Sequence, residues 1–274
     1  MKNINKKKLI FGTFIFLVLA VVYAPVLLLT VFSFSETDTM SIGQLQENGF
    51  QFGFGLYARL FSDFDIWKAV FVTVALSVIG PALATIIGTM ACVSIQRMRR
   101  RTRGIVVGLS QFPFINAEIV TAFSLLLFFS TIGIINSDFL RLILAYTLFC
   151  LPVVVLVILP RLKSLDHNLF DAAMDLGAKP HQALIQVLIP QLLPAMFASF
   201  LVGFTLSIND FVITQYNSTD LHTISTIVFG SLRGRGIPPE FRALSALMFA
   251  LVMGGLIIYN VRARKKSKQK NPLQ

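Results

Sequence analysis

The chain has 274 residues, of which 55% are hydrophobic and only 14% are charged, and its formal net charge is +11. An ordinary soluble domain carries about 25% charged residues, so the composition excludes a typical soluble globule and indicates an integral membrane protein. The positive charge lies in short clusters beside apolar runs, a pattern that argues against nucleic-acid binding and that is typical of membrane proteins.

Six apolar segments are long enough to be membrane helices, since roughly 20 apolar residues cross the hydrocarbon core as a helix. They cover residues 9–34, 67–95, 105–129, 139–159, 188–214 and 243–261. The first segment follows a basic start but is too long for the apolar region of a signal peptide, so we expect an uncleaved membrane helix. The sequence therefore predicts an all-α integral membrane protein with six transmembrane helices in one domain, residues 1–274.

The basic residues predict the orientation of these helices. Four clusters hold most of the 24 Lys and Arg residues, at 2–8, 97–103, 161–179 and 262–270. Placing all four clusters inside the cell predicts that both termini are cytoplasmic. Residues 1–8 are then a basic cytoplasmic N-terminus, and residues 262–274 are expected to be a disordered basic tail near anionic lipid headgroups.

Two outer segments follow from this topology. Residues 35–66 form an acidic loop, which we expect to be solvated. Residues 223–232, with the sequence TISTIVFGSL, predict a short interfacial or re-entrant helix before the last apolar segment.

A polar segment, residues 160–187, separates the fourth and fifth apolar segments on the predicted cytoplasmic side. Asp166 is a candidate N-cap, and Gly177 can adopt the left-handed conformation that ends a helix. Pro180 suits the first turn of a second helix. These features predict a helix, a tight turn and a second helix. The small alanine side of the first helix suits insertion into a groove of another protein, although composition alone leaves a mere connector as the alternative.

The spacing in this segment resembles the EAA loop of ABC-importer permeases, whose pattern is Glu-Ala-Ala, three residues, Gly, nine residues, Ile-x-Leu-Pro. Here Asp171, Ala172 and Ala173 precede Gly177, and the run Val187-Leu188-Ile189-Pro190 follows at the matching distance. Three further stretches are similar to permeases of spermidine/putrescine ABC importers of the PotC type: residues 151–178, 204–216 and 236–251.

The resemblance implies a type I ABC importer permease fold with cytoplasmic coupling helices, in a bacterial inner or plasma membrane. It implies a heterodimer with a second permease subunit, two cytoplasmic ATPase subunits and an extracytoplasmic substrate-binding protein. Asp171, Ala172, Ala173 and Gly177 would then couple ATP-driven closure of the ATPases to alternating access. The chain lacks the phosphate-binding motif Gly-x-x-x-x-Gly-Lys-Ser/Thr, so it is predicted not to be an enzyme.

Two acidic residues, Glu118 and Asp210, lie inside the third and fifth predicted spans. A charge at the centre of a membrane helix costs about 2.5–3.5 kcal/mol on insertion scales, so such residues usually face a pathway or a partner. The resemblance implies a polyvalent cation as substrate, and for such a cation we predict that both acids line the substrate pathway, with Asn209 as a neutral acceptor. The alternative is structural: either acid is protonated, bonds a neighbouring helix, or pairs with an arginine such as Arg141.

The remaining candidates are predicted to be structural. Cys92 and Cys150 lack metal-ligand spacing and are expected to be membrane-buried thiols, so we predict no metal and no cofactor. Most aromatic residues near the predicted interfaces are expected to anchor the chain in the membrane, with Tyr216 as the exception. They are Tyr23, Tyr57, Trp67, Tyr146, Tyr216 and Tyr259.

Alternative functions differ in cargo or in energy source. Related permeases carry iron(III), thiamine or aminoethylphosphonate, and an anionic phosphonate would favour a pathway lined with Arg or Lys rather than acids. An ATP-independent secondary transporter or channel is a rival of a different class, and transport by the purified chain alone would establish it.

Overall fold

The computed structural model describes residues 6–35, 52–115, 118–133, 137–165, 168–232 and 238–270. These residues are mostly helical, and the chain divides into two compact units, residues 67–234 and residues 1–66 with 235–274.

The unit that contains both termini is built on two long helices, α1 (Lys6–Phe32) and α13 (Glu240–Lys270). Both α1 and the short helix α3 (Gly55–Ser62) pack against α13. Because α13 is helical as far as Lys270, the prediction of a disordered tail from residue 262 is wrong for most of its length. Most of the acidic outer loop, residues 36–51, lies outside the described residues.

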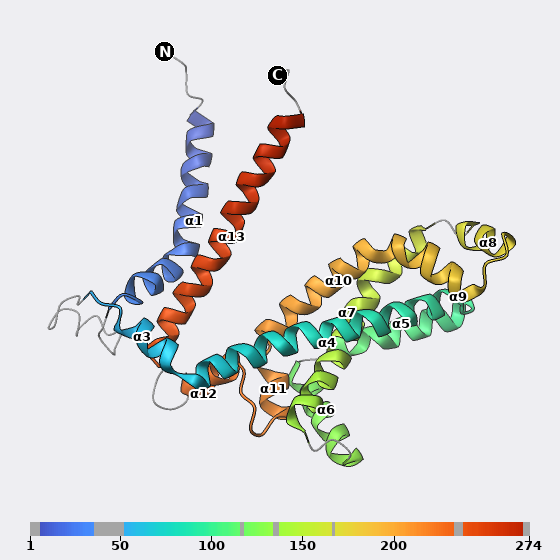
Figure 1. Cartoon of the computed structure of the whole chain (residues 1–274), viewed down its shortest axis with the longest axis horizontal. Helices are drawn as coiled ribbons and strands as arrows, with labels where there is room; N and C mark the ends of the chain where they lie inside the picture. The colour runs from blue at the N-terminus through green and yellow to red at the C-terminus, as the bar shows by residue number, and fades with distance from the viewer. Residues whose placement is uncertain are drawn as a thin grey trace. The chain divides into compact units, whose positions relative to one another are not determined.

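The other unit is a helical bundle, residues 67–234, in which the long helices lie side by side (Figure 1). Its elements are α4 (Phe64–Arg97), α5 (Arg100–Ile115), α6 (Glu118–Ile132), α7 (Asp138–Ser164), α8 (Asn168–Asp175), α9 (Pro180–Ala183), a π-helical turn (Leu184–Leu188), α10 (Ile189–Asn209), α11 (Val212–Asn217) and α12 (Ile224–Leu232). The helix α12 confirms the short helix predicted before the last apolar segment.

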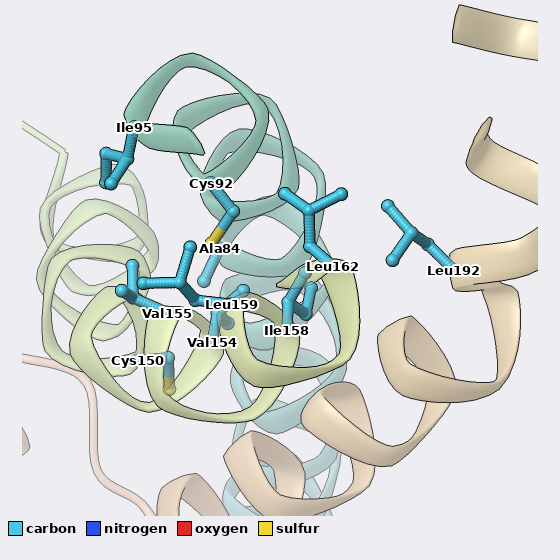
Figure 2. Packing of buried hydrophobic residues seen from close by; sticks show 10 residues of the cluster. All are labelled: Ala84, Cys92, Ile95, Cys150, Val154, Val155, Ile158, Leu159, Leu162 and Leu192. Carbon is cyan, nitrogen blue, oxygen red and sulfur yellow. The ribbon is translucent and has the colours of Figure 1, made fainter. Parts of the chain in front are cut away.

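The core of this bundle surrounds α7, which packs against α4, α5 and α10 (Figure 2). Small residues allow α4 to approach α7 closely: a Cβ atom added to Gly80 or Gly88 would lie 2.7 Å from Tyr146 Cβ or 2.5 Å from Val154 Cγ1. Close approach of backbones over small residues is a common basis for helix packing in membranes. The prediction that Cys92 and Cys150 are buried is confirmed.

Five helical segments are long and apolar enough to cross a membrane, among the residues described. They are Phe11–Phe32, Phe64–Arg97, Asp138–Ser164, Pro180–Asn209 and Glu240–Arg262, and each overlaps a predicted span. The remaining prediction, 105–129, corresponds to two helices, α5 and the shorter apolar α6, on either side of residues 116–117, which are not described.

The fifth predicted span also differs from the structure. We expected a continuous helix over residues 188–214, but α10 ends at Asn209 and α11 starts at Val212. The break falls at Asp210, whose backbone is extended with φ −69° and ψ 133°. An apolar run does not indicate such a break, because hydrophobicity reports burial in the bilayer and not the continuity of the helix.

Candidate functional site

Asp210 occupies the break between α10 and α11 and caps the start of α11. Its Oδ1 accepts a hydrogen bond from the backbone N–H of Ile213 at 3.3 Å, and its Oδ2 accepts one from Thr214 at 3.4 Å. The first N–H groups of a helix lack partners within the helix, and a carboxylate that binds them is favourably placed. Asp210 therefore holds the two helix segments in their broken arrangement.

Tyr146 of α7 reaches the same carboxyl group. Its hydroxyl donates to Asp210 Oδ2 at 2.8 Å and lies 2.8 Å from Thr214 Oγ1. All three side chains are buried, with Asp210 only 3% exposed. Because Tyr146 is 1% exposed and bonds inside the bundle, its predicted role as a membrane-interface anchor is wrong.

Glu118, the first residue of α6, is the second acid at this site. Its carboxyl group lies close enough to that of Asp210 to interact with it electrostatically. Glu118 is exposed, whereas Asp210 is buried. The structure thus brings the two sequence-predicted acids together as a pair with one accessible member.

Asn217 fastens α11 to α6 beside this pair. Its Nδ2 donates to the backbone carbonyl of Ala122 in α6 at 3.1 Å and to that of Ile213 at 3.0 Å, and the side chain is fully buried. Sequence reasoning missed Asn217, Tyr146 and Thr214. The sequence shows these polar side chains in or beside apolar runs, but the pattern does not indicate that they contact one another.

Asn209 and Arg141 have other partners in the part of the chain that the structure describes. Asn209 is exposed and its Nδ2 donates to the carbonyl of Thr205, within α10, at 3.0 Å. Arg141 lies 3.4 Å from Asp138 at the start of α7. Asp138 also accepts hydrogen bonds from the backbone N–H groups of Thr219 and Asp220, so it anchors the loop that follows α11.

A second candidate region is the hairpin formed by α8 and α9. Gly177 has a φ of +89°, which confirms the predicted left-handed helix end. The N–H of Ala178 donates to the carbonyl of Ala173 at 3.1 Å, a bond of the kind that closes a helix C-terminus. Pro180 starts α9, as predicted, while the proposed cap Asp166 lies outside the described residues.

The hairpin presents a small apolar surface. Ala172 is exposed, Ala173 is half-buried, and Leu176 next to the turn is 90% exposed. Asp171 lies in α8, but its side chain is outside the described part of the chain. Within the bundle of residues 67–234, α8 and α9 lie at the end opposite α6 and α11 (Figure 1). The acid pair and the exposed hairpin are therefore separate regions joined by α7 and α10.

Acidic side chains within membrane-spanning helical bundles are rare and usually mark a transport pathway or a contact with a partner. Residues 80–261 match the family described as "Binding-protein-dependent transport system inner membrane component". That match covers more than half of the chain, so the protein belongs to this family of ABC importer permeases. It is a multi-pass inner-membrane transport subunit and not a catalytic one, and the family implies an ATPase and a periplasmic binding protein as partners.

Several relatives align over nearly the whole chain. The spermidine/putrescine transport system permease protein PotC of Haemophilus influenzae is 32% identical over 93% of this chain and 97% of its own length. The putrescine transport system permease protein PotI of Escherichia coli K12 is 30% identical over 92% of this chain and 90% of its own length.

A solved structure shows the same fold. A bacterial ABC transporter involved in the import of the acidic polysaccharide alginate contains a chain that superposes with a TM-score of 0.62 at 17% sequence identity. The alignment covers 96% of this chain and 99% of that one. At this identity the likeness concerns the fold alone. Among the described residues, no group of three or more His, Cys, Asp or Glu side chains is arranged to hold a metal ion.

Proposed function

We propose that this chain is the permease subunit of an ATP-driven importer of spermidine and putrescine that works by alternating access. The observation that carries the proposal is the proximity of the Glu118 and Asp210 carboxyl groups at the break between α10 and α11. Relatives about 30% identical over more than 90% of the chain are named as polyamine permeases, which supports the same cargo.

The chemistry of the pair suits a polyamine cation. Protonated amines lose hydration as they enter the membrane, and carboxylate acceptors compensate for that loss. Glu118 is the accessible member and would meet the ammonium group, while Asp210 behind it is held by Tyr146 and the start of α11. Asn209, on the exposed side of α10, would offer its amide oxygen as a neutral acceptor nearby.

The proposal includes six membrane crossings. The helices α5 and α6 would together form the third crossing, in addition to the five long helices. The basic clusters then place residues 1–8, the segment 160–187 and residues 262–274 in the cytoplasm. All 274 residues would form one permease domain that pairs with a second permease subunit as a heterodimer.

The hairpin would couple the permease to its ATPase. Asp171, Ala172 and Ala173 lie in α8, and Gly177 sets the turn, so these four residues would seat α8 in a groove on the ATPase. Exposed small and apolar side chains are suited to such a groove, because they bury apolar area without leaving a polar group unpaired. Since α9 continues through the π-helical turn into α10, a displacement of the hairpin would reach the helix that ends at Asn209, directly before Asp210.

Uptake by cells tests the cargo directly. We expect deletion of the gene to abolish uptake of labelled spermidine while uptake of iron(III) and thiamine continues. The intact gene and the Glu118→Gln variant are compared at equal amounts of assembled complex. If spermidine uptake survives deletion and another solute is lost, the permease assignment stands and the polyamine assignment is wrong.

A further inference from the structure

The hairpin touches the bundle through an aromatic residue that the EAA-like pattern does not include. Phe170 lies in α8 next to Asp171, and the guanidinium carbon of Arg97 lies 4.9 Å from the centroid of its ring. A cation within about 6 Å of an aromatic face is attracted by the ring's charge distribution. Arg97 is the last residue of α4, so this contact joins the hairpin to a membrane-spanning helix.

Arg97 lies at a turn between α4 and α5 that other contacts hold in place. Arg103 of α5 donates a hydrogen bond from Nη1 to Oε1 of Gln96 in α4 at 3.0 Å, which ties the two helices together across their turn. Ile95 and Cys92, just before this corner, are part of the buried core. A displacement of Arg97 would therefore move α4, because the turn is held by this hydrogen bond and by the buried core.

The other contacts of α8 connect it to α10. The helix α8 packs mainly against α9 and the π-helical turn, and the chain continues from that turn into α10. The contact of Phe170 with Arg97 instead reaches α4, which packs against α7 on the core side. The hairpin is thus connected along the chain to α7 and α10, and through this side-chain contact to α4.

We propose that Arg97 is a positioning residue that couples the hairpin to α4, so that displacement of α8 moves α4 together with α10. The inference rests on the proposed ATPase-coupling role of α8 and names the side chains that pass its motion to a second span. Arginine suits this contact better than lysine, because its planar guanidinium stacks on an aromatic face and is less strongly hydrated. Because both partners are at least partly accessible, the contact is weak enough to form and break in a transport cycle.

The test uses the whole transporter, purified with its ATPase and partner subunits in lipid nanodiscs or liposomes. The variants are Arg97→Ala, Phe170→Leu, the two combined, and Phe170→Tyr, which keeps an aromatic face. Arg99→Ala is the matched control, since Arg99 is another exposed arginine at the same corner. The readouts are substrate transported per ATP hydrolysed, and the amount of ATPase that co-purifies.

We expect Arg97→Ala and Phe170→Leu each to lower the transport-to-hydrolysis ratio about two- to fivefold, the range for an exposed cation–π contact. The double variant should be no worse than either single one, and Phe170→Tyr and Arg99→Ala should match the parent protein. Equal effects of Arg97→Ala and Arg99→Ala, or additive losses in the double variant, would overturn the inference, because they would indicate a general effect of charge or two unrelated roles.

A separate variant tests the coupling role on which the inference rests. Ala172→Trp puts a bulky side chain on the exposed surface of α8 and should reduce ATPase co-purification. If it does, while the Arg97 and Phe170 variants keep the parent ratio, only the inference about Arg97 fails. If Ala172→Trp changes neither ATPase co-purification nor the ratio, the proposed docking of α8 fails instead.

Discussion

The hydroxyl group of Tyr146 donates a 2.8 Å hydrogen bond to Oδ2 of Asp210, 64 residues further along the chain. This bond ties α7, the centre of the bundle, to the point where α10 gives way to α11. It gives the buried Asp210 carboxyl group a hydrogen-bond donor in addition to the N–H groups of Ile213 and Thr214. The break in the helix and the position of the acid pair therefore depend on a residue outside both predicted acidic sites.

Removal of the Tyr146 hydroxyl group should weaken the hydrogen bonding of Asp210 without abolishing it. We expect Tyr146→Phe to lower the stability of the protein by about 1–3 kcal/mol, because a buried carboxyl group loses a hydrogen-bond donor. Tyr216→Phe is the control, since Tyr216 is 41% exposed. Thermal unfolding of the detergent-solubilised protein measures both. Equal unfolding temperatures for the two variants would contradict the role of Tyr146.

The two acids should respond differently to neutralisation. Glu118→Gln removes the accessible charge, and we expect spermidine uptake to fall by about ten- to a hundredfold, as for the loss of a hydrogen bond to a charged group, with normal assembly. Asp210→Asn replaces a carboxylate that accepts three hydrogen bonds with an amide that brings its own donor, so both uptake and assembly should fall. Uptake and the amount of assembled complex are measured in parallel.

A matched neutralisation controls for net charge. Asp220→Asn removes one exposed acid from the loop after α11, outside the pair, and should leave uptake unchanged. If Glu118→Gln behaves like Asp220→Asn, the acid pair does not line the substrate pathway.

The close approach of α4 to α7 gives a packing prediction. Gly88→Ala would place a Cβ atom 2.5 Å from Val154 Cγ1, so we expect a loss of about 1–3 kcal/mol from overpacking. Gly108→Ala is the matched control, because no atom lies within 4 Å of the added carbon. Combining Gly88→Ala with Val154→Ala should restore part of the lost thermal stability. A Gly88→Ala variant as stable as Gly108→Ala would show that the helices are further apart.

The turn of the hairpin gives a backbone prediction. Gly177 has a φ of +89° with no atom within 4 Å of an added Cβ, so substitution there acts through backbone strain alone. We expect Gly177→Ala to cost about 1–2 kcal/mol and to lower ATPase co-purification, because the strained turn would redirect α9. Gly177→Asn should be milder, since Asn tolerates the left-handed region. Identical co-purification for Ala and Asn would contradict this explanation.

The local structure of the hairpin could be predicted from the sequence because its signals are short-range. A glycine that ends a helix and a proline that starts one depend on the backbone of their own residues. Both predictions, at Gly177 and Pro180, are confirmed. The positions of most apolar spans were likewise predictable, since length and apolarity decide which segments can cross a bilayer.

The details of the acid pair could not be predicted because they depend on contacts between distant segments. Glu118 and Asp210 were recognised as unusual, but only packing shows that they meet and that one is buried. The prediction for Tyr146 is wrong because a tyrosine in an apolar run is also typical of an interface anchor. The break between α10 and α11 could not be predicted because Asp210 accepts a hydrogen bond from the first turn of α11, and hydrophobicity does not report such a bond.

Transport by purified components tests the central claim most directly. The chain is reconstituted in liposomes with its partner permease and ATPase subunits and supplied with binding protein and labelled spermidine. Our account predicts that spermidine accumulates only when ATP, the ATPase and the binding protein are all present, and that Glu118→Gln strongly reduces the accumulation. Accumulation by the chain alone without ATP would contradict it and would indicate a secondary transporter or channel.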